Sequence, residues 1–230
     1  MIELIFKTKF DHYAKYFAFT LAEVLIVIGI IGVVASLTIP QLMQNSQEQQ
    51  FKSAAKEAYS KAYQAVMQMR AEQGGSLSSY YQSPNTFKPD FIKYFKVIND
   101  CGFKNCVSST TLSDVYKTLF KNNAATTLMD EGQFITADGM FWGIQNSYHS
   151  GIQNNLMFTI DVNGYMKNPN VYGRDVFVFQ YINENLYPMG APQSSLQAPT
   201  YCKRDAEAMF EGQNFQGYGC MYYVMQGIDY

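Results

Sequence analysis

The feature that most constrains this chain is an apolar run over residues 19–39, in which Glu23 is the only charged side chain. As a helix, these 21 residues span about 30 Å, the thickness of the hydrocarbon core of a bilayer. A carboxylate near the bilayer centre costs roughly 2.5–3.5 kcal/mol, and less towards the edge. The run therefore predicts one membrane-spanning helix and marks Glu23 as a candidate functional residue.

The remaining composition is that of an ordinary exported domain. The chain has 230 residues and a formal net charge of −2, and its charges are dispersed without a basic stripe, so nucleic acid is not an expected partner. The two histidines, His12 and His149, lie outside any nucleophile or metal motif. We therefore expect a protein that is not an enzyme.

An ordinary secretory signal peptide is the competing interpretation of the apolar run. Val33-Val34-Ala35 could serve as its small-residue cleavage site. The apolar core of a signal peptide usually runs 7–15 residues, however, and cleavage there would leave Glu23 without a purpose. We favour a retained helix that follows a short leader over residues 1–18.

The junction before the apolar run carries a family resemblance. Ala18 followed by Phe19-Thr20-Leu21-Ala22-Glu23 resembles the processing signal of the type IV pilin and type II secretion pseudopilin superfamily, over about residues 16–43. The resemblance implies cleavage by a prepilin peptidase between Ala18 and Phe19, followed by N-methylation of Phe19. Most members carry Gly where this chain has Ala18. It also implies that the leader stays cytoplasmic and that the C-terminal domain is exported.

The resemblance assigns Glu23 to assembly. The amino group of a neighbouring subunit's Phe19 would neutralise this carboxylate in a low-dielectric fibre core and set the axial register. The alternative is a Glu near the membrane edge that snorkels to the headgroups. Pro40, at a position where pilins commonly have a proline, predicts a kink or break in the helix.

Helical periodicity resumes after Pro40 and predicts an amphipathic stem helix over 40–73 that ends at Gly74-Gly75. Its apolar stripe recurs at spacings of three and four and consists of Phe51, Ala55, Ala58, Ala62, Val66 and Met69. We expect the stripe to pack against the head, residues 74–230.

The head is expected to have about four strands, at 133–136, 140–145, 156–161 and 176–182. Short helices are expected at 91–95 and 113–120, and a hairpin turn at 137–139. The predicted fold class is α+β, with a long N-terminal transmembrane and amphipathic stem helix packed on an antiparallel sheet, as in pilins.

The four cysteines are expected outside the cytoplasm, where disulfides persist. We favour the pairs Cys101–Cys106 and Cys202–Cys220, because sequence-local pairs close small loops at low entropic cost. A zinc site fits poorly, since neither spacing forms a C-x2-C knuckle.

Residues 161–175 contain a second candidate site. Asp161 and Asn163, in a turn ending at Gly164, present hard oxygen ligands, and Asp175 could complete a calcium site. Major pseudopilins, which this stretch resembles, bind calcium in a comparable loop. The alternative is an Asx turn, in which Asp and Asn cap their own backbone.

Together these features predict a prepilin-like subunit of a type IV pilus or a type II secretion pseudopilus. Its expected partners are prepilin peptidase, other pilin or pseudopilin subunits, the inner-membrane assembly machinery and membrane lipid. We expect one pass through a bacterial inner membrane with the head extracytoplasmic, and then a place in a pilus or pseudopilus at the cell surface. The alternative function is a single-pass, membrane-anchored extracytoplasmic binding protein.

Overall fold

The structure is a computed structural model that describes residues 20–77, 86–107, 114–125, 128–129, 131–146, 156–203 and 213–230. The chain divides into two compact units, Met1–Asn45 and Ser46–Tyr230. The leader, Ala18 and Phe19 lie outside the described residues.

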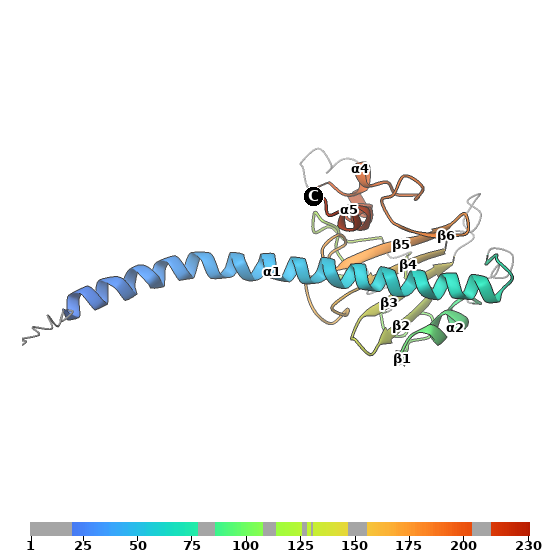
Figure 1. Cartoon of the computed structure of the whole chain (residues 1–230), viewed down its shortest axis with the longest axis horizontal. Helices are drawn as coiled ribbons and strands as arrows, with labels where there is room; N and C mark the ends of the chain where they lie inside the picture. The colour runs from blue at the N-terminus through green and yellow to red at the C-terminus, as the bar shows by residue number, and fades with distance from the viewer. Residues whose placement is uncertain are drawn as a thin grey trace, which may run out of the picture. The chain divides into compact units, whose positions relative to one another are not determined.

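The first described element is α1, a helix that runs from Leu21 to Glu72 without interruption (Figure 1). Of the kink or break expected at Pro40, the break is wrong, because α1 continues through this residue. A proline removes one backbone donor from the helix ladder. The other residues of the turns on both sides keep their backbone donors, so the helix can continue. The helix ends where the sequence predicts: Gly74 and Gly75 have φ of 76° and 100°, and the Gly75 N–H donates to the Arg70 carbonyl at 2.8 Å.

The N-terminal half of α1 is a candidate membrane span. Of the helices in the described ranges, α1 alone is long and apolar enough to cross a bilayer. Its large apolar side chains are exposed all round the helix, from Leu21, which is 79% exposed, to Met43, which is 68% exposed. A helix that is hydrophobic all round belongs in lipid or in a helix-packed core.

The described residues of the second unit form an antiparallel sheet in which the strands lie in sequence order from β1 to β6 (Figure 1). The expected α+β class is therefore confirmed, as are the four predicted strands, which are β2 to β5. The strands are β1 Val97–Asp100, β2 Gly132–Thr136, β3 Phe141–Asn146, β4 Leu156–Asp161, β5 Val176–Ile182 and β6 Asn185–Pro188.

One face of the sheet is covered by the part of α1 that belongs to this unit. Ala55, Ala58 and Ala62 are completely buried, and they share one core with aromatic side chains of the strands, such as Phe158. Small side chains on the helix let the sheet aromatics approach its backbone. Tyr59 extends this contact, with its ring 5.3 Å from that of Phe179. The predicted stripe is therefore the surface that joins stem and head.

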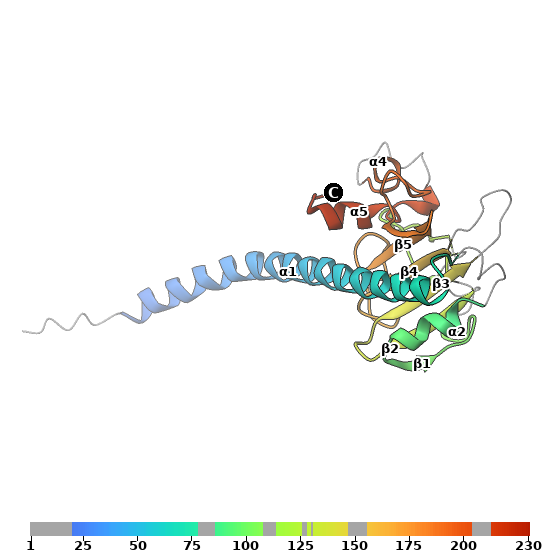
Figure 2. The same cartoon turned by 45° about the vertical axis from the view of Figure 1, so that its right-hand side comes forward.

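The other face of the sheet carries a second core, which includes Tyr116, Phe141, Tyr172, Val178 and Tyr218. The C-terminal elements follow the sheet along the chain: α4 Ala198–Tyr201, η3 Gln213–Phe215 and α5 Cys220–Gln226. Helix α5 contacts α4, β5 and β6, so these helices gather at the β5–β6 side of the sheet (Figures 1 and 2).

Three local predictions differ from the structure. The strands β1 and β6 were not expected: β1 is exposed and interrupted by a bulge, and β6 follows a two-residue turn at Asn183 and Glu184, both with positive φ. Of the short helix expected over 113–120, only residues 114–115 are helical among the described residues, and the rest of the prediction is wrong, because Lys117 lies in isolated β-bridges. The helix expected at 91–95 is present as α2, Lys88–Phe91, and η1, Ile92–Tyr94.

Candidate functional site

The candidate assembly residue Glu23 lies in the first turn of α1, where it forms a capping box with Thr20. The Glu23 carboxylate accepts hydrogen bonds from the Thr20 backbone N–H at 2.8 Å and from the Thr20 hydroxyl at 2.9 Å. In return, the Glu23 N–H donates to Thr20 Oγ1 at 3.2 Å. Each residue satisfies a polar group that the helix terminus would otherwise leave unpaired. The T-x-x-E spacing is a recognised signal for this cap, and our sequence interpretation overlooked it.

The two hydroxyls deeper in the apolar run are also satisfied within the helix. Ser36 Oγ donates to the Val33 carbonyl at 2.8 Å, and Thr38 Oγ1 donates to the Val34 carbonyl at 3.0 Å. Such bonds to a preceding turn remove the cost of placing a hydroxyl in lipid. With both hydroxyls paired, Glu23 remains as the one ionisable side chain in the described part of the apolar run, 20–39.

Both cysteine pairs favoured from the sequence are bonded in the structure: Cys101 to Cys106 and Cys202 to Cys220, with Cα–Cα distances of 5.3 and 4.9 Å. The described residues contain no free cysteine. Disulfides persist in oxidising compartments, so they indicate that the head lies outside the cytoplasm.

The Cys101–Cys106 loop is held to the sheet by buried polar groups. Lys88, which is 7% exposed, forms an ion pair with Asp100 and donates to the Gly102 carbonyl at 2.9 Å. On the other side of the loop, the fully buried Gln133 side chain pairs with both the N–H and the carbonyl of Val107. These contacts fix the loop to the sheet.

The candidate calcium residues meet at the end of β4 and the start of β5. Asp161 and Asp175 are both fully buried. Asp161 Oδ1 accepts from the N–H groups of Asn163 and Gly164 at 3.3 and 2.9 Å, and its Oδ2 accepts from the Tyr116 hydroxyl at 3.0 Å. The two bonds to Oδ1 are those of an Asx turn.

Asp175 is held in a similar way by the backbone of its own loop. Its carboxylate accepts from the Asn170 N–H at 2.8 Å and from the Val171 N–H at 2.7 Å. Burial raises the pKa of Asp175 to about 6. Burial, together with the charge of Asp175, raises the pKa of Asp161 to about 8. Because the charge of Asp175 acts on Asp161, protonation of one of the two buried carboxyls is favoured.

The same loop contains amide oxygens that have no hydrogen-bond partner. Asn163 Oδ1 and Asn170 Oδ1 are both buried and unsatisfied, whereas their amide nitrogens donate to loop carbonyls. Buried polar atoms nearly always have a partner, and neutral amide and carboxylate oxygens are the ligands that calcium prefers. No cluster of three or more acidic, His or Cys ligands occurs in the described ranges. The loop therefore offers a mixed oxygen set of two carboxylates and two amides.

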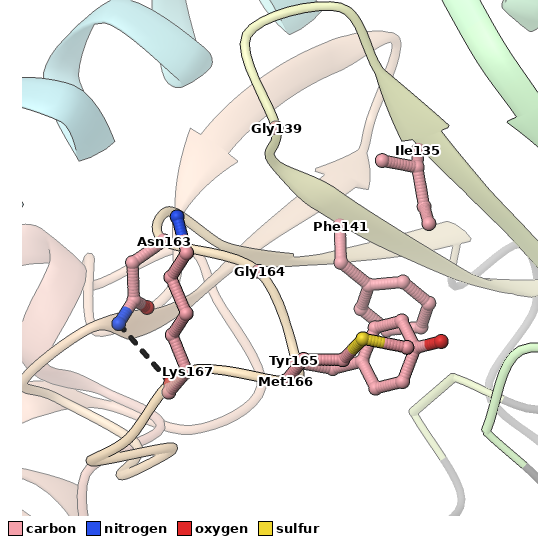
Figure 3. A pocket seen from close by; sticks show the side chains of 8 residues that line it. All are labelled: Ile135, Gly139, Phe141, Asn163, Gly164, Tyr165, Met166 and Lys167. Carbon is pink, nitrogen blue, oxygen red and sulfur yellow. Dashed lines mark hydrogen bonds between the residues drawn. The ribbon is translucent and has the colours of Figure 1, made fainter.

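A pocket lies between the β2–β3 hairpin and the loop over 163–167 (Figure 3). Ile135 and Phe141 form its wall from the sheet, and Tyr165 packs its ring 5.2 Å from that of Phe141. Glycine at position 164 allows the two segments to approach closely. Its φ is +86°, and a Cβ there would come within 2.7 Å of the Gly139 carbonyl oxygen. Our sequence interpretation missed this pocket, because its walls come from segments about 30 residues apart.

The two histidines of the chain, His12 and His149, lie outside the described residues. Comparisons of the chain with known protein families, with curated proteins and with solved structures found no match. The functional conclusions therefore rest on the resemblance in the sequence around residues 18–23 and on the geometry of α1, the head and the loop over 161–175.

Proposed function

We propose that this chain is a pilin-like or pseudopilin-like structural subunit, which prepilin peptidase cuts between Ala18 and Phe19 and which polymerises through its N-terminal helix. The observation that carries the proposal is the difference in side-chain burial between the two halves of α1. From Phe51 onward one stripe of the helix is buried against the sheet, whereas between Leu21 and Met43 its large apolar side chains are exposed. The exposed half needs a lipid or helix partner, since water is a poor solvent for it.

The proposed partners follow from this arrangement. The exposed half of α1 would lie in the bacterial inner membrane after export of the head, and then against the same helices of other subunits in the fibre. Ala35 and Ser36, with Gly29 and Gly32, provide small side chains that allow close helix approach. An inner-membrane assembly machinery would move the processed subunit from lipid to fibre.

The experiment that tests the proposal compares wild type with Glu23→Val. Intact-mass analysis of the wild-type protein from membranes should give a chain that begins with N-methylated Phe19. Electron microscopy should show fibres that contain the protein, and Glu23→Val should remain in the membrane while fibres are lost. An intact leader on the mature protein, or normal fibres from Glu23→Val, would refute the proposal.

A membrane-anchored extracytoplasmic binding protein is the second candidate, and the pocket in Figure 3 is the observation that favours it. Such a protein needs neither cleavage at Ala18 nor the Glu23 carboxylate. Normal localisation and an unprocessed N-terminus in both the wild type and Glu23→Val would favour this second function over the first.

We also propose that the loop over 161–175 binds calcium through Asp161, Asp175 and the amide oxygens of Asn163 and Asn170. The support is the pair of buried amide oxygens without partners in the same loop as two buried carboxyls. A divalent cation would offset the cost of ionising both carboxyls in the same buried region. The ion's part would be to hold the loop, and no chemical step depends on it.

A further inference from the structure

Arg174 lies directly before Asp175, one of the proposed calcium ligands, and brings a permanent positive charge to that part of the loop. Its backbone is fixed by a tight turn, in which the N–H groups of both residues donate to the Val171 carbonyl at 3.0 and 3.3 Å. Burial raises the pKa of Asp175 to about 6, and the charge of Arg174 opposes this shift. A positive charge that favours the ionised carboxylate also competes with a bound cation for it.

The Arg174 side chain extends from the loop to the stem helix α1, where it pairs with Glu48. Its Nε lies 3.6 Å from Glu48 Oε1, and the two side chains are only 28% and 26% exposed. That distance is too long for a hydrogen bond, and the buried Nε has no hydrogen-bond partner. Both residues belong to the second unit, Ser46–Tyr230. At Nε the contact therefore depends on charge attraction rather than on a hydrogen bond.

A second cation on the same face of α1 contacts other groups. Lys52 lies one helical turn after Glu48, but its Nζ contacts Asp229 Oδ1 at 3.2 Å and lies 5.2 Å from the centre of the Tyr230 ring. The Tyr230 hydroxyl in turn donates to the Gly173 carbonyl at 2.6 Å, so this contact also holds the loop. The Glu48 carboxylate is therefore left to the guanidinium of the loop.

We propose that Glu48 is a positioning residue for the calcium site: it attracts the Arg174 guanidinium towards the stem and so reduces the competition of that charge with calcium for the Asp175 carboxylate. The inference rests on the calcium site proposed above, in which Glu48 is not a ligand. Without Glu48, the guanidinium and the divalent cation would share one carboxylate and repel each other. Because coupling between two sites is reciprocal, calcium should strengthen the Arg174–Glu48 contact by the same factor.

Calorimetric titration of the full-length, detergent-solubilised protein with calcium chloride at pH 7.5 tests the effect. Glu48→Gln removes the charge with little change in shape and should weaken calcium binding about three- to ten-fold. Arg174→Gln should strengthen it about three- to ten-fold, for the same reason with the opposite sign. A gain in affinity distinguishes this function from a structural one, since loss of packing would weaken the site. Arg174→Met is a second neutral variant of similar length and should give the same gain.

Glu57→Gln is the matched control. It removes a carboxylate from the same helix, but this one pairs with Lys61 at 2.7 Å. The control should bind calcium within about two-fold of wild type, as expected for an exposed charge away from the site.

A double-mutant cycle separates an effect through Arg174 from a direct effect of the Glu48 charge on calcium. In the Arg174→Gln background, Glu48→Gln should change the affinity by less than about two-fold, because the charge that it positions is gone. An equal loss in both backgrounds would overturn the inference. As a second readout, unfolding of the same four proteins in denaturant should give a larger coupling between residues 48 and 174 in excess calcium than in chelator. Equal couplings would contradict it as well.

The outcomes separate this inference from the proposed calcium site. A wild type that binds no calcium would refute both. Calcium binding that is unchanged in Glu48→Gln, or weakened in both neutral Arg174 variants, would leave the calcium site standing and refute the positioning by Glu48.

Discussion

Thr20 and Glu23 satisfy each other's polar groups at the start of α1, through hydrogen bonds of 2.8, 2.9 and 3.2 Å. The carboxylate that the sequence marks as costly in a membrane is therefore also part of a helix cap. A cap needs a hydrogen-bond acceptor, whereas pairing with the amino group of another subunit needs a negative charge. The two functions of Glu23 can be separated by substitution.

Glu23→Gln should retain the cap and lose the charge, because Gln also serves at the third position of a capping box. If assembly depends on the charge, Glu23→Gln should give as few fibres as Glu23→Val, while the amount of protein in the membrane stays close to that of wild type. Quantitative electron microscopy together with immunoblots of membranes measures both. Wild-type fibre yield from Glu23→Gln would show that Glu23 acts through the cap alone.

Ala18 should be accepted by the peptidase as a small residue at the junction, so Ala18→Gly should be processed at least as completely as wild type. Ala18→Leu should leave the leader attached, since a large side chain replaces the small one at the cut. Intact-mass measurement of the membrane protein gives the processed fraction directly. Equal processing of Ala18→Leu and wild type would contradict cleavage at this bond.

The two disulfides should contribute unequally to stability. In the chain-entropy model, a loop such as Cys202–Cys220, with a sequence separation of 18, is worth about 3 kcal/mol, and a loop such as Cys101–Cys106, with a separation of 5, about 2 kcal/mol. Double alanine variants of each pair, unfolded in denaturant, measure the difference. A larger loss from the Cys101–Cys106 variant would show that its packing with Gln133 and Lys88 outweighs the loop length.

The buried acid pair should make the head less stable as the pH rises. Burial raises the pKa of Asp161 to about 8 and that of Asp175 to about 6, above their ordinary value of 3.8. Between about pH 4 and pH 8 the folded head then binds more protons than the unfolded chain, so its free energy of unfolding falls with rising pH. Asp161→Asn should flatten this dependence in thermal unfolding at fixed calcium-free conditions.

Asp138→Asn is the matched control for the acid pair. Although partial burial raises the pKa of Asp138, its hydrogen bonds with Thr136 and Lys61 outweigh burial and lower it. A carboxyl with a lowered pKa stabilises the fold above its unfolded pKa and loses this effect on acidification. Asp138→Asn should therefore leave the fall between pH 4 and pH 8 unchanged. An unchanged slope in Asp161→Asn would refute the assignment to the pair.

Calcium should reverse the destabilisation at neutral pH, because it favours the ionised carboxyls. Excess calcium should raise the melting temperature of wild type at pH 7.5, and a chelator should lower it. Asp175→Asn and Asn170→Ala should each weaken the response, whereas Asp138→Asn should keep it. A melting temperature of wild type that does not change with calcium or chelator would leave the Asx turn as the whole function of this loop.

Periodicity and spacing predicted the elements whose determinants are local. The stripe from Phe51 to Met69 could be read directly, because residues three and four apart share a helix face. The four inner strands were found because their apolar residues are contiguous. The outer strands β1 and β6 were missed, since one is exposed and the other depends on a turn at Asn183 and Glu184 that lacks glycine.

The apolar run, with its single carboxylate, by itself determined that this chain has a helix long and apolar enough to cross a membrane. Such properties depend only on neighbours along the chain. Only the tertiary structure decided that Asp161 and Asp175 are both buried, that two amide oxygens of the same loop lack partners, and that Gly164 approaches the β2–β3 hairpin at a pocket. These features require strands and loops that are distant in sequence to come into contact. A carboxyl is buried only after that contact forms, and only then does burial change its charge.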